Sequence, residues 1–336
     1  MTGGGAGEAP PSAGGGQHIC LVIKDLDVGK GGAERLFVEL AAILAGLGYK
    51  VTCLYYGAAL NRSQLRLDES IEVRNLASDD ARTISPLMKS RRFRGLVLRL
   101  LRLGYGLPWV ARLIWQATHG RFTEALRRYF SEVRPAVAIS FLPPANTPVL
   151  VAAQGTPVRV VCTNHNVPAA DYDDPSRWDP NPHDRRLRLS ALDGAAAIHI
   201  LAPSFATWFP QHLHEKISVI PNYVSPAILK SRVAGACDRL VLAAGRLAKV
   251  KEYATLARAW ALIASRFPDW RVEVYGDGPL RGRLADEVDR LGIADTFRLC
   301  GYEPDIGAVY ARASIFCHPA RFDAFGLAVA EARALG

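Results

Sequence analysis

The stretch that decides the fold reads LVLAAGRLAKVKEYATLARAWALIASRFPDWRVEVY and covers residues 240–275. Its first five residues are all apolar, and its last five alternate valine with larger polar or aromatic residues, so each end is typical of a strand. Between them, residues 252–266 carry apolar side chains at helical spacing, including Leu256, Trp260 and Ile263. A strand, a helix and a second strand in this order predict a βαβ unit with two parallel strands.

The same alternation continues on both sides of this unit. Downstream, we expect strands at 296–300 and 314–318 and helices at 280–291, 305–311 and 326–335. Upstream, we expect a helix at 32–47 and strands at 18–23, 50–56, 71–75, 136–141, 158–163 and 196–201. Two such arrays predict an α/β fold with two Rossmann-like βαβ domains facing across a cleft, with the ligand at the carboxyl ends of the strands.

The domain boundaries follow from composition. Residues 1–17 consist mainly of Gly, Ala, Pro and Ser and lack the basic and apolar regions of a secretion signal, so we expect a disordered tail. We assign 18–224 to the N-terminal domain, 225–238 to a linker with turn chemistry, and 239–336 to the C-terminal domain. Because the chain stops directly after a predicted helix, we expect the C-terminal domain to be incomplete.

The bulk composition narrows the class of protein. The chain has 336 residues, and its 41 basic and 32 acidic side chains leave a net charge of +9, which favours partners that carry phosphates or other acidic groups. Its six cysteines lie far apart, without the spacing of a structural zinc site or a disulfide framework, so a reducing cytosol suits them. The sequence lacks an uncharged apolar stretch long enough to predict a membrane-spanning helix.

Two glycine-containing loops join a predicted strand to a predicted helix. Gly31 and Gly32 open the first helix of the chain, where free N–H groups and the helix dipole favour a phosphate. Gly245 follows the strand at 240–244 and clears space for a ligand, while Arg246 offers a planar fork to a diphosphate and Lys251 a point charge. Taken alone, each loop is also compatible with an ordinary turn or with solvated basic surface.

The third functional segment covers residues 321–331 and contains two carboxylates eight residues apart. Such a spacing around a strand-to-helix turn lets Asp323 and Glu331 address two ends of one extended ligand. Glu331 can accept hydrogen bonds from both ribose hydroxyls, and Asp323 can meet a sugar ring. The N–H groups of 325–327, contributed by Phe325, Gly326 and Leu327, can point at the phosphate between them.

These motifs in this order resemble glycosyltransferase family 4. The resemblance rests on residues 31–35, 219–222, 245–247 with Lys251, 275–279, Gly301 and the pair of carboxylates in 321–331. It implies the GT-B fold, a retaining reaction, a nucleotide-diphosphate sugar bound by the C-terminal domain and an acceptor bound by the N-terminal one. Residues 139–146 and 164–166 are in addition similar, more loosely, to bacterial family members that extend lipid-linked or other cell-envelope glycans.

The resemblance also assigns roles to single residues. Arg246 and Lys251 match the pair that holds the donor pyrophosphate, and Glu331 matches the ribose ligand. Asp323 stands where the family usually has Glu, so its side chain is one methylene shorter. His165 resembles the histidine that approaches the donor sugar, and it completes the predicted catalytic set with Arg246, Lys251 and Asp323. The leaving diphosphate itself takes the acceptor proton, so a protein nucleophile is not required.

We expect neither a metal ion nor a cofactor besides the donor, which we predict to be linked to UDP or GDP. Residues 25–27 and 171–173 match the Asp-X-Asp pattern of metal-dependent GT-A enzymes, but two aspartates at this spacing are common by chance. A GT-A fold would also leave the second βαβ array unexplained.

A basic segment at 89–128 points to the acceptor. It contains ten basic residues and one acidic residue, interleaved with leucine, valine, isoleucine and tryptophan, a composition typical of helices that lie on an anionic membrane. Two ordinary domain helices with a solvated basic face are the alternative. Because a recognised nucleic-acid motif is lacking, we do not expect nucleic acid as a partner. We predict a cytoplasmic protein, peripheral on the inner face of the cytoplasmic membrane, with a glycan or lipid-linked acceptor.

Two other functions remain open from the sequence. One is a non-catalytic or truncated module that binds a sugar nucleotide and a membrane, favoured by Asp323 and by the end of the chain at Gly336. The other is a different activity on the GT-B fold, such as a sugar-nucleotide epimerase.

Overall fold

The computed structural model describes residues 15–26, 32–57, 67–78, 103–174, 177–231 and 237–336. The chain divides into two compact units between Ile220 and Pro221, and each unit is described by itself.

The strands of the first unit form a seven-stranded sheet in the order β3-β2-β1-β4-β5-β6-β7. Every neighbouring pair in it is parallel. Its strands are β1 (His18–Ile23), β2 (Lys50–Tyr55), β3 (Glu72–Asn75), β4 (Val137–Phe141), β5 (Arg159–Thr163), β6 (Ala197–Ile200) and β7 (Ile217–Val219). Six of them are the predicted ones. β7 was not predicted, because three residues are too few to show an alternating pattern.

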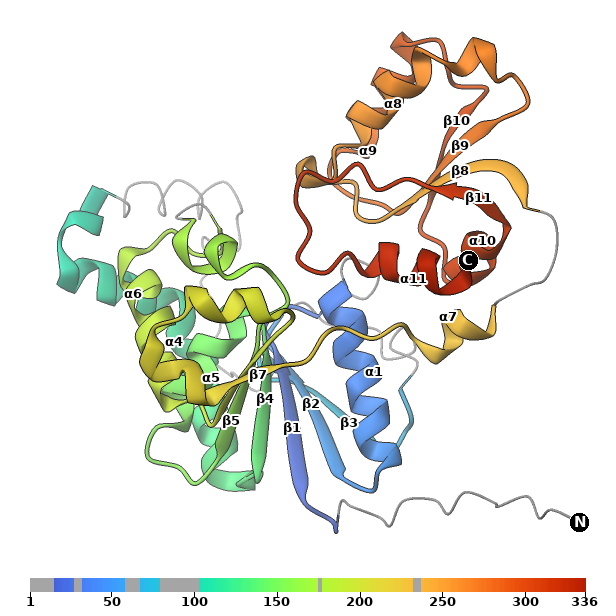
Figure 1. Cartoon of the computed structure of the whole chain (residues 1–336). Coiled ribbons are helices and arrows are strands. Elements are labelled where there is room, and N and C mark those ends of the chain that lie inside the picture. The colour runs from blue at the N-terminus through green and yellow to red at the C-terminus, as the bar shows by residue number, and fades with distance from the viewer. Residues whose placement is uncertain (1–14, 27–31, 58–66, 79–102, 175–176, 232–236) are drawn as a thin grey trace, which may run out of the picture. The chain divides into compact units, whose positions relative to one another are not determined.

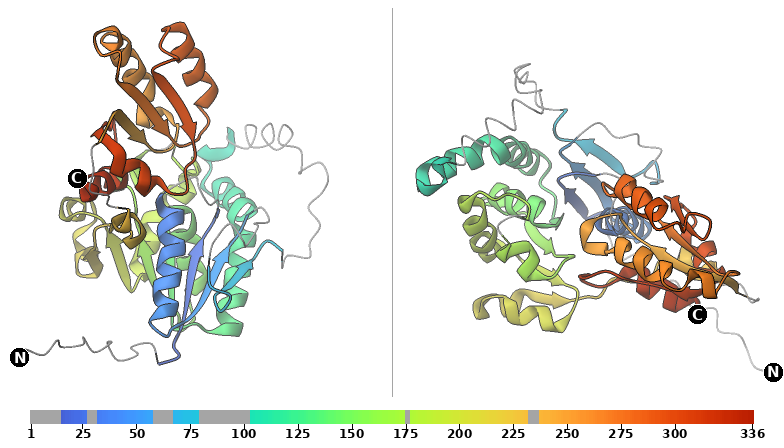
Figure 2. Two further views of the ribbon diagram at one scale, coloured as in Figure 1. Left: turned by 90° about the vertical axis from the view of Figure 1, so that its right-hand side faces the viewer. Right: turned by 90° about the horizontal axis from the view of Figure 1, so that it is seen from above.

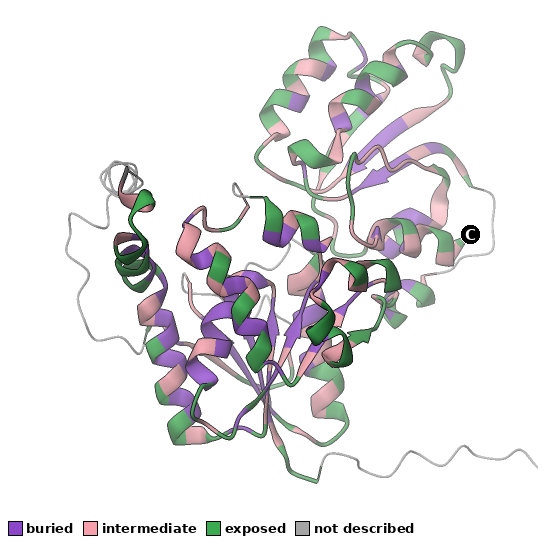
Figure 3. Cartoon of the chain, turned by 60° about the vertical axis from the view of Figure 1, so that its left-hand side comes forward, coloured by how far each residue is buried: buried purple, intermediate pink, exposed green. Residues whose placement is uncertain are grey.

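Helices cover both faces of this sheet (Figure 1). They are α1 (Gly32–Gly46), α4 (Pro108–Val133), α5 (Pro143–Ala153) and α6 (Pro182–Ser190), with short helical turns between them. β1 shows the two faces directly, since Cys20 and Val22 pack in a core with α4 and α5, whereas Leu21 and Ile23 pack in a core with α1. The buried residues accordingly lie along the strands and the inner helix faces (Figure 3).

The second unit contains a four-stranded parallel sheet in the order β10-β9-β8-β11. Its strands are β8 (Asp238–Ala244), β9 (Arg271–Tyr275), β10 (Phe297–Gly301) and β11 (Ala313–Phe316). Its helices are α7 (Pro226–Lys230), α8 (Tyr253–Ala261), α9 (Arg281–Arg290), α10 (Ile306–Arg312) and α11 (Leu327–Leu335). α8 and α9 pack on one face of the sheet, and α10 and α11 on the other (Figure 2). All four strands and four of these helices match the predicted ones within a few residues.

Two segments differ from the sequence prediction. The helix expected at 252–266 ends at Ala261, and a separate 3-10 turn follows at Ala264–Arg266, so the apolar spacing outlasts the helix. The segment 225–238, expected to be a linker, contains α7, which begins at Pro226 and is capped by the Ser225 side chain. A β-carbon on Gly307 would lie 2.4 Å from Ser231 Oγ, so the segment after α7 packs closely on α10.

Among the described helices, none combines the length and the apolar character that a membrane span requires.

Candidate functional site

At the carboxyl edge of the second sheet, the loops after β8 and β9 pack tightly on each other. β8 runs into Gly245 and β9 into Gly276, and the Gly245 N–H donates to the Tyr275 carbonyl at 2.9 Å. Gly276 has φ +131°, and a β-carbon there would lie 2.2 Å from the Gly245 carbonyl oxygen. A β-carbon on Gly278 would similarly meet the Leu247 backbone at 2.5 Å. Glycine is therefore required in this edge because backbone packs directly on backbone.

The cationic residues predicted to bind the diphosphate follow β8. Arg246 is exposed in the loop directly after Gly245. The chain then makes a 3-10 turn at Lys249–Lys251 and passes through Glu252, at φ +52°, into α8. This turn directs Lys251 toward the loop after β11, where its Nζ lies 2.5 Å from Asp323 Oδ2. The two predicted catalytic residues are therefore paired with each other, although 72 positions separate them.

Asp323 has three cationic or polar partners. Besides Lys251, His318 Nε2 lies 3.1 Å from its Oδ2, and the Gly326 N–H hydrogen-bonds its carboxylate. Partial burial by itself would raise the pKa of Asp323, but Lys251, His318 and the Gly326 N–H together hold this pKa below its ordinary value. The carboxylate is therefore ionised at neutral pH, and it is paired with the Lys251 ammonium.

His318 is a member of this site that the sequence did not single out. It follows β11, and its ring stacks on Phe316 with centroids 6.4 Å apart. Burial, followed by the charge of Lys251, lowers the pKa of His318 despite the neighbouring Asp323 carboxylate. The available signal was its place at the end of a predicted strand, but a histidine at such a position is not specific.

Glu331 has a different environment from Asp323. It lies on α11, its residue is 3% exposed, and the Tyr310 hydroxyl donates to its Oε2 at 3.1 Å. Tyr310 comes from α10, so tertiary packing brings the phenol to the carboxylate. The structure thus places an ionised, partly exposed carboxylate before α11 and a buried one within it.

The N-terminus of α11 lies between these two carboxylates. Gly326 has φ +68° and caps the helix, and its carbonyl accepts from the N–H groups of Val329 and Ala330. Leu327 is the first helical residue, and Phe325 is half-buried before the cap. The left-handed conformation at Gly326 explains glycine at this position.

His165 belongs to the first unit and lies just after β5. Its ring stacks on Phe141, with centroids 5.1 Å apart and planes at 12°. His165 Nε2 lies 3.0 Å from Thr163 Oγ1, and the Thr163 hydroxyl donates to the Ser140 carbonyl. Because the only hydroxyl hydrogen of Thr163 is used, we assign the proton between Thr163 and His165 to Nε2. Of the two glycines predicted in the first loop, Gly32 is the exposed first residue of α1, and Gly31 lies outside the described residues.

The carboxylates of 171–173 face different partners. Asp171 is buried and accepts from Asn166 and Trp178, whereas Asp173 accepts from Trp208. Burial raises the pKa of Asp171. Because the two side chains are engaged separately, this segment does not form an Asp-X-Asp metal site. Of the other segment, Asp27 lies outside the described residues.

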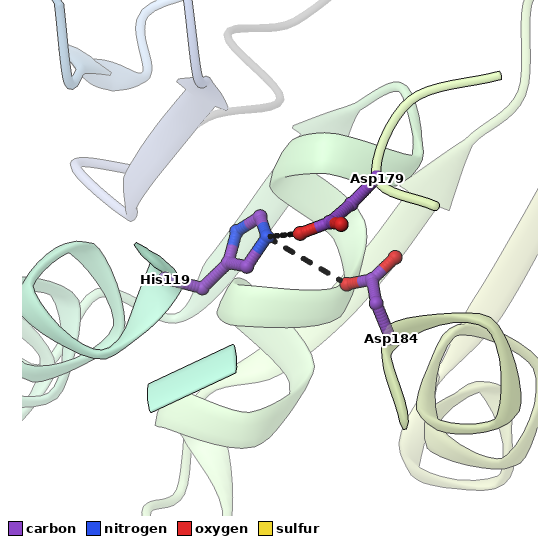
Figure 4. A group of neighbouring side chains, drawn as sticks. All are labelled: His119, Asp179 and Asp184. Carbon is purple, nitrogen blue, oxygen red and sulfur yellow. Dashed lines mark hydrogen bonds and ion pairs between the residues drawn. The ribbon is translucent and has the colours of Figure 1, made fainter. Parts of the chain in front are cut away.

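Within the described residues, one cluster has the side-chain types of a metal site: His119, Asp179 and Asp184 (Figure 4). His119 Nε2 lies 2.7 Å from Asp179 Oδ2, and Lys24 Nζ lies 3.4 Å from His119 Nδ1. The two oxygens of Asp184 accept from Trp115 and from the Arg188 guanidinium. His119, the Asn181 N–H, Trp115 and the Arg188 guanidinium already satisfy these carboxylates, so we interpret the cluster as a buried network that ties α4 to α6.

Two family descriptions match the chain. The N-terminal part matches Glycosyltransferase Family 4 over residues 30–227, and the C-terminal part matches Glycosyl transferases group 1 over residues 227–336.

The curated relatives share less than a third of their residues with this chain over the aligned parts. An uncharacterised glycosyltransferase of Haemophilus influenzae is 28% identical over 116 residues, which are 34% of this chain and 32% of that protein. A second relative, from Campylobacter jejuni, is 27% identical over 195 residues, which are 57% of this chain and 51% of that protein. It is named GalNAc-alpha-(1->4)-GalNAc-alpha-(1->3)-diNAcBac-PP-undecaprenol alpha-1,4-N-acetyl-D-galactosaminyltransferase. The matches thus span about half or less of these relatives.

A solved structure supports the fold. The pneumococcal O-GlcNAc transferase GtfA, determined in complex with UDP and GlcNAc, aligns with a TM-score of 0.68 at 12% identity. The alignment covers 96% of this chain and 83% of the solved one. With a family match over more than half of its length and parallel α/β sheets of the GT-B type, the chain belongs to glycosyltransferase family 4.

Proposed function

We propose that this chain is a retaining glycosyltransferase that moves a sugar from a nucleotide-diphosphate sugar to a glycan or a lipid-linked acceptor. One observation carries the proposal: Lys251, which follows Arg246 in the loop after β8, is paired with Asp323 in the loop after β11, and the helix that follows Asp323 carries a buried Glu331. Cations suit a diphosphate, and a buried carboxylate suits vicinal hydroxyls. The complex of GtfA with UDP and GlcNAc supports a UDP-sugar as the donor, and a GDP-sugar is the other candidate.

In the proposed mechanism the protein acts by positioning and by charge. Lys251 leaves Asp323 to bind the diphosphate, Arg246 adds a second cation, and Glu331 holds the ribose. The diphosphate departs while the acceptor oxygen forms its bond on the same face of the sugar, and a diphosphate oxygen takes the acceptor proton. The freed Asp323 orients the sugar. Stabilising the departing charge is the main catalytic contribution, because such contacts are strongest where charge develops.

The direct test combines candidate donors with candidate acceptors and detects a glycosidic product. Arg246→Ala should lower kcat about 10²- to 10³-fold, the usual cost of removing one group that stabilises a developing anion. Circular dichroism should be unchanged, since Arg246 is exposed. The matched control is Arg283→Ala, an equally exposed arginine on α9. Full turnover by Arg246→Ala would refute the assignment, and donor binding without any product would favour the non-catalytic module.

We further propose that the first unit binds an anionic membrane, so that the enzyme acts at the inner face of the cytoplasmic membrane. The start of α4 exposes an apolar group: Leu107 is 51% exposed, Trp109 63% and Leu113 56%. Trp109 and Leu113 are one helical turn apart, and the exposed Arg112 lies beside them. Exposed apolar residues next to a cation are typical of a helix that lies on lipid. The undecaprenol-linked substrate in the name of the Campylobacter relative supports a lipid-linked acceptor.

The other residues of the basic segment do not all face solvent. Ile114 and Trp115 are buried within the first unit, and residues 89–102 lie outside the described residues. Only one face of α4 is therefore available to lipid.

The membrane proposal is tested by sedimentation with phosphatidylglycerol vesicles at low salt. The double variant Trp109→Ser, Leu113→Ser should lose most of the vesicle-bound fraction. Leu262→Ser is the matched control, because Leu262 is 81% exposed in the second unit. Wild-type protein that stays in the supernatant would overturn the membrane proposal and leave the transfer reaction untouched.

A further inference from the structure

The donor site contains a buried phenol to which neither the sequence nor the proposed mechanism gives a role. Tyr253 is the first residue of α8, and only 5% of the residue is exposed. Among the described residues, its hydroxyl has no hydrogen-bond partner. Native proteins pair nearly all their buried polar groups, so an unpaired hydroxyl in a binding site indicates a partner that arrives with the ligand.

The position of the hydroxyl connects it to the diphosphate site. It lies 2.9 Å from the point where a β-carbon on Gly245 would sit, and Lys251 Cε lies 3.8 Å from the same point. The phenol therefore ends directly under the Gly245 turn, beside the Lys251 side chain. Gly245 has φ +143° and no side chain, and this allows the phenol to lie so close to its backbone.

The hydroxyl can act only as a neutral donor or acceptor. Burial, followed by the charge of Asp323, raises the pKa of Tyr253, and the phenol keeps its proton at neutral pH. The Asp323 carboxylate is already paired with the Lys251 ammonium, and His318 Nε2 lies 3.1 Å from it. An anion that draws Lys251 away from Asp323 therefore moves a side chain that lies near the phenol.

We propose that Tyr253 is an additional donor-binding residue, whose hydroxyl donates a hydrogen bond to a phosphate oxygen of the bound nucleoside diphosphate. This inference rests on the proposed function. Tyr253 then provides a third donor beside Arg246 and Lys251, and it is uncharged. Binding converts an unpaired buried hydroxyl into a charge-assisted hydrogen bond, so the group contributes to ligand affinity and not to the stability of the free protein.

The test is the variant Tyr253→Phe, which keeps the ring and removes only the hydroxyl. Titration calorimetry with UDP and GDP identifies the nucleotide that wild-type protein binds. For that nucleotide, Tyr253→Phe should weaken binding about 10- to 150-fold, the range for one hydrogen bond to a charged group. Affinity for the corresponding nucleoside should not change. Tyr302→Phe is the control, because Tyr302 is 59% exposed in the same unit.

Thermal unfolding without nucleotide provides the second readout. The Tm of free Tyr253→Phe should equal or exceed that of wild type, because the variant removes a buried group that has no partner. A lower Tm would mean that the hydroxyl has a structural partner, and it would overturn the inference. Unchanged diphosphate affinity would also overturn it. If wild-type protein binds neither diphosphate and forms no product, the proposed function fails as well, whereas wild-type turnover with an unaffected Tyr253→Phe refutes only the role of Tyr253.

Discussion

The substitution Glu331→Gln tests the ribose contact in isolation. Glu331 is 3% exposed on α11, and Tyr310 donates to its Oε2 at 3.1 Å, so its rotamer is held in place. Glutamine has nearly the same shape and can still accept from Tyr310 through its carbonyl oxygen. The substitution therefore removes the negative charge and one acceptor atom while preserving the packing.

The magnitude follows from the type of bond that is lost. A carboxylate oxygen that accepts from a ribose hydroxyl forms a hydrogen bond to a charged group, which contributes about 1.5–3 kcal/mol. At about 1.4 kcal/mol for each factor of ten, Glu331→Gln should weaken nucleoside diphosphate binding about 10- to 150-fold. The Tm of the free protein should change little.

The assay is a double-mutant cycle in which one change is made in the protein and the other removes the ribose hydroxyls of the ligand. Titration calorimetry compares the nucleoside diphosphate with its 2′,3′-dideoxy form on wild type and on Glu331→Gln. Wild type should prefer the natural ligand strongly, and Glu331→Gln should lose most of that preference. Tyr310→Phe keeps the carboxylate and should show a smaller loss. If Glu331→Gln weakens both ligands equally, Glu331 does not bind the ribose and the reasoning is refuted.

Three further predictions concern other features of the chain. EDTA should not abolish transfer, because Arg246 and Lys251 can meet the diphosphate charge; complete loss that a divalent metal restores would contradict this. Arg271 and Arg312 help hold the pKa values of Asp238 and Glu273 below their ordinary range. The stability that these pairs contribute is present above the ordinary carboxyl pKa and is lost as the pH falls through the lowered pKa values. In urea unfolding, the free energy of unfolding should therefore fall in acid, and it should fall less in Asp238→Asn. Burial raises the pKa of Cys162 to about 12, so iodoacetamide at pH 8 should alkylate the exposed Cys237 and spare Cys162; mass spectrometry of the peptides would reveal the opposite order.

Periodicity was sufficient for most of the fold because the central strands β1, β2, β8 and β9 are largely buried and the helices have one apolar side. It failed where an element was too short, as in β7, or where helical spacing continued past the end of α8. The same limit concealed α7, whose five residues begin with a proline in a segment with turn chemistry. In each case contacts with distant elements stabilise a conformation that the local pattern does not specify.

The sequence by itself determined the residue types at the proposed donor site. It singled out Arg246, Lys251, Asp323 and Glu331 as candidates from their motifs. Only the tertiary structure decided their pairing: Lys251 lies against Asp323, Tyr310 orients Glu331, and Tyr253 lies unpaired beneath Gly245. The physical reason is that hydrogen bonds and ion pairs depend on distances of a few ångströms between side chains from different elements, and packing of the whole unit sets those distances.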